Sequence, residues 1–337
     1  MKILHTGHGA PSPAGDACQH CISSTSTGHN VTNCIHGSSN TNVGNVSNSY
    51  NNTINLGGNE ESRRIQTWLS PLEPYRRHQD VRNRRLDGVG EWVLRRDEFK
   101  SWRASQDGSH DPTLRCYGDQ GVGKTYIRYN SIPQKPYTVL MRKSSSLVID
   151  IFLEEARGQN IAVLYFYCDY QAQKDQSAAN IIGGLLKQVA VGTPGVPDEI
   201  KSAFESRKGG GQSLRVLDML KLLVKTVSFI RRVYICIDAV DELRPQDRSE
   251  FLRALRQIIQ NASNVRLFLT GRPYVRVELD NHLMKGTYTM HIVPNQGDIG
   301  RYISRKMDDD DARDPHLMTE DLKSDITSIM LEKASEM

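Results

Sequence analysis

The chain has 337 residues, of which 38% are hydrophobic and 24% charged, a composition that allows one large α/β domain or two smaller ones. The net charge of +4 is too small to indicate nucleic-acid binding, because Lys and Arg alternate with Asp and Glu over most of the chain. No apolar run approaches the roughly 20 residues of a membrane helix and no signal peptide opens the chain, so we expect a cytoplasmic protein with no membrane partner.

The first segment, residues 1–58, is rich in Gly, Ser, Asn and Thr and contains few large apolar side chains. Such a segment cannot bury enough surface to offset the entropy of ordering, so we expect it to be mostly disordered. Within it, residues 42–56 alternate Asn with Val, Tyr, Ile and Leu. This pattern is compatible with self-assembly through stacked Asn side chains and also with a plain linker.

Residues 59–105 are interpreted as lead-in helices and a segment that precedes the main domain. A helical apolar rhythm covers residues 60–69, and Pro71 and Pro74 are expected to end it. A basic cluster follows between Arg76 and Arg96, mixed with acidic residues. We interpret the cluster as a solvated face of ion pairs, with nucleic-acid binding as the alternative.

The most informative stretch is a complete G-x-x-x-x-G-K-[ST] phosphate-binding loop, which follows a predicted strand at residues 113–117. Its glycines leave backbone N–H groups open to phosphates, Lys124 is placed to reach the β- and γ-phosphates, and Thr125 can bind Mg²⁺. The alternative, a glycine-rich surface turn, is disfavoured by the preceding strand. We therefore predict a site for ATP or ADP with Mg²⁺ in a loop made of Gly118, Asp119, Gln120, Gly121, Val122, Gly123, Lys124 and Thr125.

The chain after this loop does not read as the long helix that should follow it. Pro133 and Pro136 fall where a helix interior would cost about 3 kcal/mol for each proline. Helical rhythm returns at Ser146, and removing residues 129–145 would give one continuous amphipathic helix. We interpret residues 129–145 as an insertion, either a surface excursion or a translated intron.

Three further stretches predict strands of one parallel sheet. Residues 160–167, 232–238 and 264–270 are nearly continuous apolar runs, typical of strands buried on both faces, and residues 287–293 add another strand. Helices are expected at residues 177–191, 197–207, 213–229 and 246–260. The cysteines inside the strands, Cys116, Cys168 and Cys236, are expected to be reduced core residues.

Carboxylates follow the strand at residues 232–238. Ligands bind outside the carboxyl ends of strands in an open α/β sheet, so Asp238 is expected to hold Mg²⁺ through water, while Glu242, with Asp241, polarises the attacking water. The alternative is an acidic N-cap for the next helix. Arg272, after the following strand, is expected to contact the γ-phosphate or to form a surface salt bridge.

The pattern as a whole predicts a parallel five-stranded P-loop NTPase sheet of the ASCE type, flanked by helices, over residues 106–310. Asp308 to Asp311 reads as a charged break. Residues 311–337 are expected to be helical, and because the amphipathic rhythm continues to Met337 we interpret them as the start of a truncated downstream region.

From about Ile65 onward, these motifs resemble the NACHT-type, nephrocystin-like P-loop NTPase module of fungal NOD-like receptors, which belong to the STAND ATPases. The resemblance rests on residues 78–102, the loop, the DAVDEL and TGRP boxes and the closing GDIGRYISRKM. It implies that Asp238 is the magnesium aspartate, that Asp241 and Glu242 serve hydrolysis, and that Arg272 is the sensor. It also implies that Gly88, Gly90 and Trp92 lie near the base.

Modules of this kind act in innate immunity as switches that are closed with ADP and opened by ATP, with a winged-helix region and a repeat domain downstream. By this resemblance the function is a nucleotide-dependent signalling switch that hydrolyses ATP slowly and forms homo-oligomers through its NTPase module. The alternatives are a non-catalytic assembly scaffold with a degraded pocket, and a P-loop kinase. ATP is preferred over GTP because no Asn-Lys-x-Asp box occurs.

Overall fold

The computed structural model describes most of the chain after residue 59. The described residues are 60–83, 85, 88–105, 111–118, 136–192, 196–206, 214–283, 288–292, 296–311 and 319–335. The expectations for residues 1–58 and for Asp119 to Thr125 of the loop lie outside these ranges.

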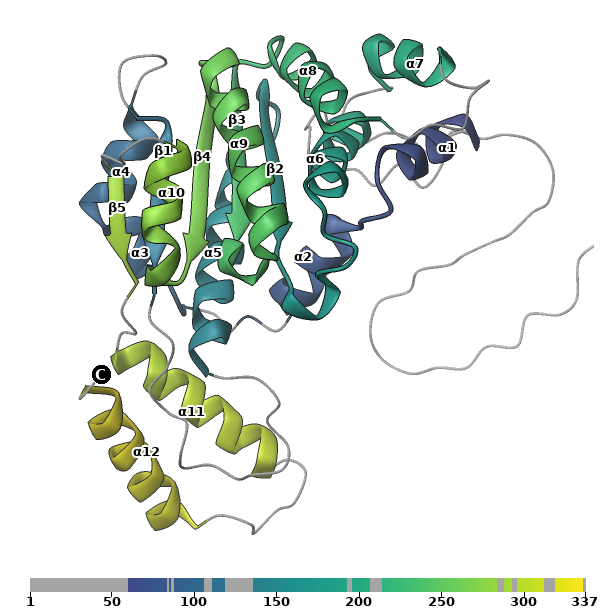
Figure 1. Ribbon diagram of the computed structural model, residues 1–337. Helices are drawn as coiled ribbons and strands as arrows, with labels where there is room; N and C mark the ends of the chain where they lie inside the picture. The colour runs from purple at the N-terminus through teal and green to yellow at the C-terminus, as the bar shows by residue number, and fades with distance from the viewer. Residues whose placement is uncertain are drawn as a thin grey trace, which may run out of the picture. The chain divides into compact units, whose positions relative to one another are not determined.

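A parallel sheet of five strands in the order β2-β3-β4-β1-β5 forms the centre of the described residues (Figure 1). Its strands are β1 (Thr113–Tyr117), β2 (Ile161–Tyr167), β3 (Arg232–Asp238), β4 (Val265–Gly271) and β5 (Tyr288–His291). All four pairings are parallel. The predicted fold class is confirmed, and β4 lies between the strand that leads into the phosphate-binding loop and the strand that ends at Asp238.

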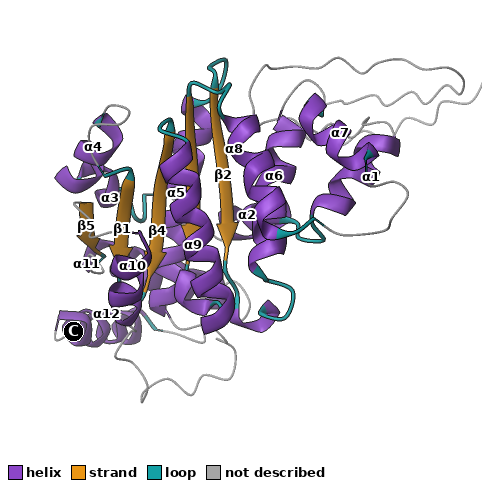
Figure 2. Ribbon diagram, turned by 45° about the horizontal axis from the view of Figure 1, so that its top comes forward, coloured by secondary structure: helices purple, strands orange, loops and turns teal. Residues whose placement is uncertain are grey.

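Helices cover both faces of this sheet (Figure 2). Successive strand residues point to opposite faces, so Ile235 packs with α6 (Ala178–Gly192), α8 (Val216–Val227) and α9 (Pro245–Asn261), while Tyr234 packs with α4 (Asp97–Ala104) and α5 (Pro136–Glu155). The other helices are α1 (Glu60–Leu69), α2 (Pro74–Asn83), α3 (Trp92–Arg95), α7 (Asp198–Glu205), α10 (Arg276–Leu283), α11 (Gln296–Asp311) and α12 (Glu320–Ser335). Short 3₁₀ turns follow three strands: η1 (Tyr170–Ala172), η2 (Val240–Glu242) and η3 (Pro273–Val275).

The lead-in helix α1 has the predicted bounds and is part of the main core. Leu69 is buried with residues of α6, and a Cβ added at Gly183 of α6 would lie 2.0 Å from the Leu69 carbonyl oxygen. The ammonium of Lys187 donates to the carbonyls of Leu72 and Ser70, at 3.2 and 3.5 Å. Helix α6 therefore holds the segment that joins α1 to α2.

The structure corrects the expected start of the helix after the loop. Helix α5 begins at Pro136, so residues 136–145, which we assigned to the insertion, are helical and continuous with the segment that begins at Ser146. Proline is well suited to the first position of a helix, where its missing N–H has no intrahelical partner to lose. The same physics explains α2, which begins at Pro74, a residue that was expected only to end the preceding helix.

Two further expectations at the end of the chain have different outcomes. Helix α11 continues through Asp311, so the charged break expected at Asp308 to Asp311 is wrong. Helix α12 covers Glu320–Ser335, inside the segment of residues 311–337 that we expected to be helical. No helix in the described ranges combines the length and the apolar character needed to cross a membrane.

Candidate nucleotide site

The carboxyl ends of β1 and β4 meet at the start of the phosphate-binding loop. The backbone N–H of Gly118, the first loop residue, donates to the carbonyl oxygen of Gly271 at 3.2 Å. The loop therefore begins beside the end of β4, next to Thr270 and Arg272. Gly118 is the part of the loop that the structure describes, and the positions of Lys124 and Thr125 stay predictions.

Asp238 ends β3 as a buried carboxylate with a relative exposure of 1%. Its Oδ1 accepts hydrogen bonds from Ser145 Oγ at 2.5 Å and from Thr270 Oγ1 at 2.7 Å. The backbone N–H of Ala239 donates in turn to Thr270 Oγ1 at 2.9 Å. A carboxylate surrounded by hydroxyl oxygens is the hard donor set that Mg²⁺ prefers, so these residues fit the predicted metal.

Asp241 lies in η2, and both of its carboxylate oxygens contact Arg272. Oδ1 accepts from the Arg272 backbone N–H at 3.2 Å, and Oδ2 lies 3.1 Å from the guanidinium Nε. Burial raises the pKa of Asp241, and the charge of Arg272 opposes that rise. Helix α9 is preceded by Arg244 with no side-chain cap, so the alternative role of the acidic residues as its N-cap finds no support. The predicted sensor arginine and one predicted hydrolytic acid form an ion pair.

Glu242, the third acid, faces the turn that follows β2 instead. Its Oε2 accepts from the backbone N–H of Tyr170 at 3.2 Å, and its carbonyl oxygen accepts from the Gln173 side chain at 2.7 Å. The residue is 7% exposed. The acidic turn therefore separates its two carboxylates, one toward β4 and one toward β2.

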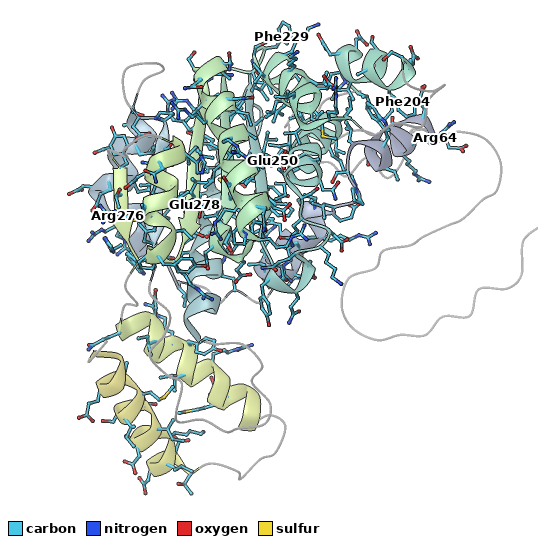
Figure 3. The ribbon with its side chains drawn as sticks, in the orientation of Figure 1. Arg64, Phe204, Phe229, Glu250, Arg276 and Glu278 are labelled. Carbon is cyan, nitrogen blue, oxygen red and sulfur yellow. The ribbon has the colours of Figure 1, made fainter. Side chains whose placement is uncertain are left out.

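Arg248 of α9 holds this acidic turn, a contact that sequence reasoning missed. Its NH1 donates to the carbonyl oxygens of Leu243 and Asp241 at 3.1 and 3.3 Å, and its Nε donates to Glu278 of α10 at 2.8 Å. Glu278 lies on the side of α10 that faces α9 (Figure 3). The available signal was a charged residue on the apolar stripe of α9, one turn before the buried Phe251.

Three consecutive buried serines of α5 contact three different parts of the site. Ser145 binds Asp238, and Ser146 Oγ accepts from Arg85 NH1 at 3.2 Å. Ser144 lies against Gly90, where an added Cβ would be 2.8 Å from the Ser144 hydroxyl. Successive helix residues point about 100° apart, so one turn of α5 reaches all three neighbours.

The glycines of the segment before the loop are held by α11. Gly88 and Gly90 have φ values of +73° and +87°, which only glycine adopts without strain. The N–H of Gly90 donates to Asp298 Oδ2 at 2.9 Å, and Arg301 NH1 donates to the Gly88 carbonyl at 2.7 Å. Trp92 begins α3 and packs against the core formed with α4 and α5.

The basic cluster is largely an ion-pair network, as we interpreted it. Arg95 and Arg96 pair with acids close to them in sequence, Glu91 and Glu98. By contrast, Arg77 reaches Asp169 after β2 at 2.7 Å.

A second part of the cluster surrounds Asp150 of α5. His78 of α2 is buried between the Tyr167 hydroxyl, 2.8 Å from Nδ1, and Asp150 Oδ1, 3.1 Å from Nε2, while Arg85 pairs with Asp150 Oδ2. Burial tends to raise the pKa of Asp150, but the hydrogen bond and charge of His78, together with Arg85, lower it below the ordinary value. Burial also raises the pKa of Tyr167. The network attaches α2 to the end of β2 and to α5.

Comparison with known proteins gives one family match. The chain matches the family described as "Nephrocystin 3, N-terminal" over residues 88–272. A search of curated proteins finds no match.

Three solved structures resemble this chain distantly. The Aeropyrum pernix ORC1 protein in complex with DNA is 15% identical, with a TM-score of 0.34, over 72% of this chain and 53% of that one. Drosophila ORC bound to DNA is 16% identical, with a TM-score of 0.34, over 73% and 50% of the two chains. The Walker-type ATPase PABY2304 of Pyrococcus abyssi is 12% identical, with a TM-score of 0.32, over 66% and 58%. This chain thus spans less than two thirds of each, and such scores say nothing about its ligands or partners.

The family match begins at Gly88 and ends at Arg272, so it contains the segment held by α11, the loop, the acidic turn and the end of β4. It covers more than half of the 337 residues. The chain belongs to the nephrocystin 3 N-terminal family.

Proposed function

We propose that this protein is a nucleotide-dependent signalling switch that binds ATP or ADP with Mg²⁺ and hydrolyses ATP slowly. The supporting observation is a run of hydrogen bonds along one edge of the sheet. Gly118 at the start of the loop bonds to Gly271, Thr270 bonds to Asp238, and Arg272 bonds to Asp241. A loop that binds phosphates and a carboxylate that binds metal are thereby joined through β4.

Each residue of the proposed site has its own role in hydrolysis. Lys124 and the loop N–H groups bind phosphate oxygens, Thr125 and Asp238 hold the metal, and Glu242 orients and deprotonates the attacking water. When bound, Mg²⁺ neutralises charge on the phosphate oxygens. Asp241 contacts Arg272, and in this proposal it positions that arginine for hydrolysis.

Slow hydrolysis follows from the state of Arg272. An arginine that contacts the transferring phosphoryl group speeds hydrolysis by orders of magnitude in P-loop NTPases. Here the guanidinium is 3.1 Å from the Asp241 carboxylate, so it must leave that partner before it can reach a phosphate. In the proposed enzyme the ion pair with Asp241 therefore competes with the contact between Arg272 and the phosphate, which slows hydrolysis.

The signalling role comes from the resemblance to NACHT modules of STAND proteins. On that basis the ADP form is closed and the ATP form assembles into homo-oligomers through the NTPase module in the cytoplasm, with residues 42–56 as a further self-assembly segment. Light scattering of the full chain with ADP and with a non-hydrolysable ATP analogue tests the assembly. Equal masses in both states would contradict it.

Nucleotide binding is tested with fluorescent ATP and ADP analogues in the presence of Mg²⁺. We expect Lys124→Ala to lose most of the affinity, because the ammonium pairs with phosphate charge. Lys201→Ala is the matched control, since Lys201 lies on α7 with its side chain 46% exposed and pairs only weakly, at 3.6 Å, with Asp198. Equal, weak binding by the parent and both variants would favour the assembly scaffold.

The insertion hypothesis needs a version of the chain without residues 129–143, because a deletion up to residue 145 would also remove the serine that binds Asp238. Stronger nucleotide binding by the shortened chain would show that the extra residues obstruct the pocket. A P-loop kinase would differ from the proposed switch and from the assembly scaffold in its product. It would yield a phosphorylated acceptor, whereas the proposed enzyme releases only inorganic phosphate.

A further inference from the structure

We infer that Ser145 and Thr270 are positioning residues that fix Asp238 for magnesium, an inference that rests on the proposed function. All three residues are 1% exposed. Ser145 lies on α5, the helix after the phosphate-binding loop, and Thr270 lies on β4. Because both bind Asp238 at the end of β3, one carboxylate joins α5, β3 and β4.

Both hydroxyls donate to the same oxygen of Asp238, at 2.5 and 2.7 Å. A carboxylate oxygen offers about two lone-pair sites, so these two donors fill Oδ1. Oδ2 is then the oxygen that serves the metal or its water shell. Hydrogen bonds to a charged acceptor are strong, and stronger still in a buried site of low dielectric, so the pair of hydroxyls locks the rotation of the carboxylate.

Thr270 also fixes the backbone that follows Asp238. Its Oγ1 accepts from the N–H of Ala239, which has φ +54° and ψ +48° in the left-handed region. Among the described residues other than glycine, Ala239 alone has a positive φ, a conformation that is strained for a residue with a Cβ. Because that hydroxyl already accepts from Ala239, its own hydrogen is available for Asp238. The Thr270 side chain thus fixes both the orientation of the Asp238 carboxylate and the backbone of the turn that carries Asp241 and Glu242.

Ser145 links the carboxylate of Asp238, the proposed metal ligand, to helix α5. It lies on the helix that follows the phosphate-binding loop, 93 residues away from Asp238 in sequence. Supporting groups of this kind orient a metal ligand, and their removal typically costs 10- to 100-fold in metal affinity. The same range is expected for Ser145 and Thr270.

The test measures Mn²⁺ binding to the full chain by electron paramagnetic resonance, with ADP present. Ser145→Ala and Thr270→Val should each weaken Mn²⁺ binding about tenfold or more, while the affinity for a fluorescent ADP analogue in EDTA stays unchanged. Ser145→Thr and Thr270→Ser keep the hydroxyl and should restore most of the Mn²⁺ affinity. Thr226→Val is the control, because Thr226 is a buried threonine of α8 whose hydroxyl donates to Leu222 O at 2.8 Å.

The outcomes separate this inference from the proposed function. If the parent binds Mn²⁺ with ADP and the Ala and Val variants bind it equally well, the positioning role is wrong and the switch stands. If the parent binds neither Mn²⁺ nor nucleotide, both are wrong. A purely structural role of the two hydroxyls would give a different pattern. Ser145→Thr and Thr270→Ser would then fail to restore the Mn²⁺ affinity, and Thr226→Val would lose Mn²⁺ affinity to the extent that its melting temperature falls.

Discussion

The guanidinium of Arg272 lies against the carboxylate of Asp241, with Nε 3.1 Å from Oδ2. The same aspartate accepts the Arg272 backbone N–H, and its carbonyl oxygen accepts the Tyr274 hydroxyl at 3.1 Å. Asp241 therefore organises the residues after β4. Glu242, the other acid that follows Asp238 in the proposed site, lies toward β2 instead, where its carboxylate accepts the backbone N–H of Tyr170 at 3.2 Å.

The first prediction distinguishes these two acids. Glu242→Gln removes the proposed base and should lower phosphate release by about 10²- to 10⁴-fold, the usual contribution of a positioned base, while nucleotide affinity is retained. Asp241→Asn keeps an acceptor for the Arg272 N–H but removes the ion pair with the guanidinium, so phosphate release should be retained or rise. Steady-state phosphate release at saturating ATP and Mg²⁺ measures both. An Asp241→Asn variant as inactive as Glu242→Gln would show that Asp241 takes part in the reaction.

The second prediction concerns the two adjacent glycines of α6. A Cβ at Gly183 would lie 2.0 Å from the Leu69 carbonyl oxygen, whereas the nearest atom to a Cβ at Gly184 is Pro74 Cγ at 3.6 Å. Gly183→Ala should therefore destabilise the protein by about 1–3 kcal/mol, as overpacking does. Gly184→Ala should be neutral or stabilising by up to about 1 kcal/mol, because alanine favours a helix.

Urea unfolding of the two glycine variants measures the difference. Opposite signs for neighbouring positions would show that α1 is docked on α6 in solution. Equal effects would mean that the segment around Leu69 does not pack against α6 as the structure has it.

The strands and the acidic edge could be predicted because their signals are local. A strand buried on both faces is a continuous apolar run, and in a parallel sheet the residues after such runs share one edge. The place of Asp238 at the end of its strand followed from that rule, and the structure joins this carboxylate to Thr270 near the end of β4 by a hydrogen bond of 2.7 Å.

Other features could not be predicted because they depend on distant contacts. A proline can end one helix or begin the next. The sequence alone therefore does not show whether Pro74 and Pro136 end a helix or begin one, and the structure places them at the start of α2 and α5. The bond from Ser145 to Asp238 spans 93 residues, and that of Arg248 to Glu278 spans 30. Neither follows a local period in the sequence.

The third prediction is a pH dependence of stability that is due to Asp150. Its pKa in the folded protein lies below the ordinary value of 3.8, because His78 and Arg85 outweigh the effect of burial. A carboxyl group with a lowered folded pKa stabilises the fold above its unfolded pKa, and this contribution is lost as the pH falls through the folded value. Asp150→Asn should thus cost about 2 kcal/mol at pH 7, the typical size of hydrogen bonds to a charged group.

Below about pH 4 the difference between Asp150→Asn and the parent should shrink, since the parent then loses the same charge. Urea unfolding from pH 7 down to about pH 3 follows this change. Asp198→Asn serves as the control, because the Asp198 side chain is 95% exposed and its partner Lys201 is 3.6 Å away. A constant difference across this pH range would exclude the charge of Asp150 as the cause.

The last prediction compares two glycines with positive φ. Gly158, at φ +67°, has no atom within 4 Å of an added Cβ, so Gly158→Ala should cost only the backbone strain of about 1–2 kcal/mol. Gly90, at φ +87°, has Ser144 Oγ at 2.8 Å and Ser144 Cα at 3.3 Å from that position. Gly90→Ala should therefore cost about 1–3 kcal/mol more.

Gly90→Ala should also weaken binding of a fluorescent ADP analogue, because it moves the segment that Asp298 holds through the Gly90 N–H at 2.9 Å. Gly158→Ala, in the turn after α5 and away from that segment, should leave ADP affinity unchanged. Urea unfolding and fluorescence titration of both variants make the comparison. Equal destabilisation and equal ADP affinity would show that the contact between Gly90 and Ser144 is not close in solution and that this segment does not support the nucleotide site.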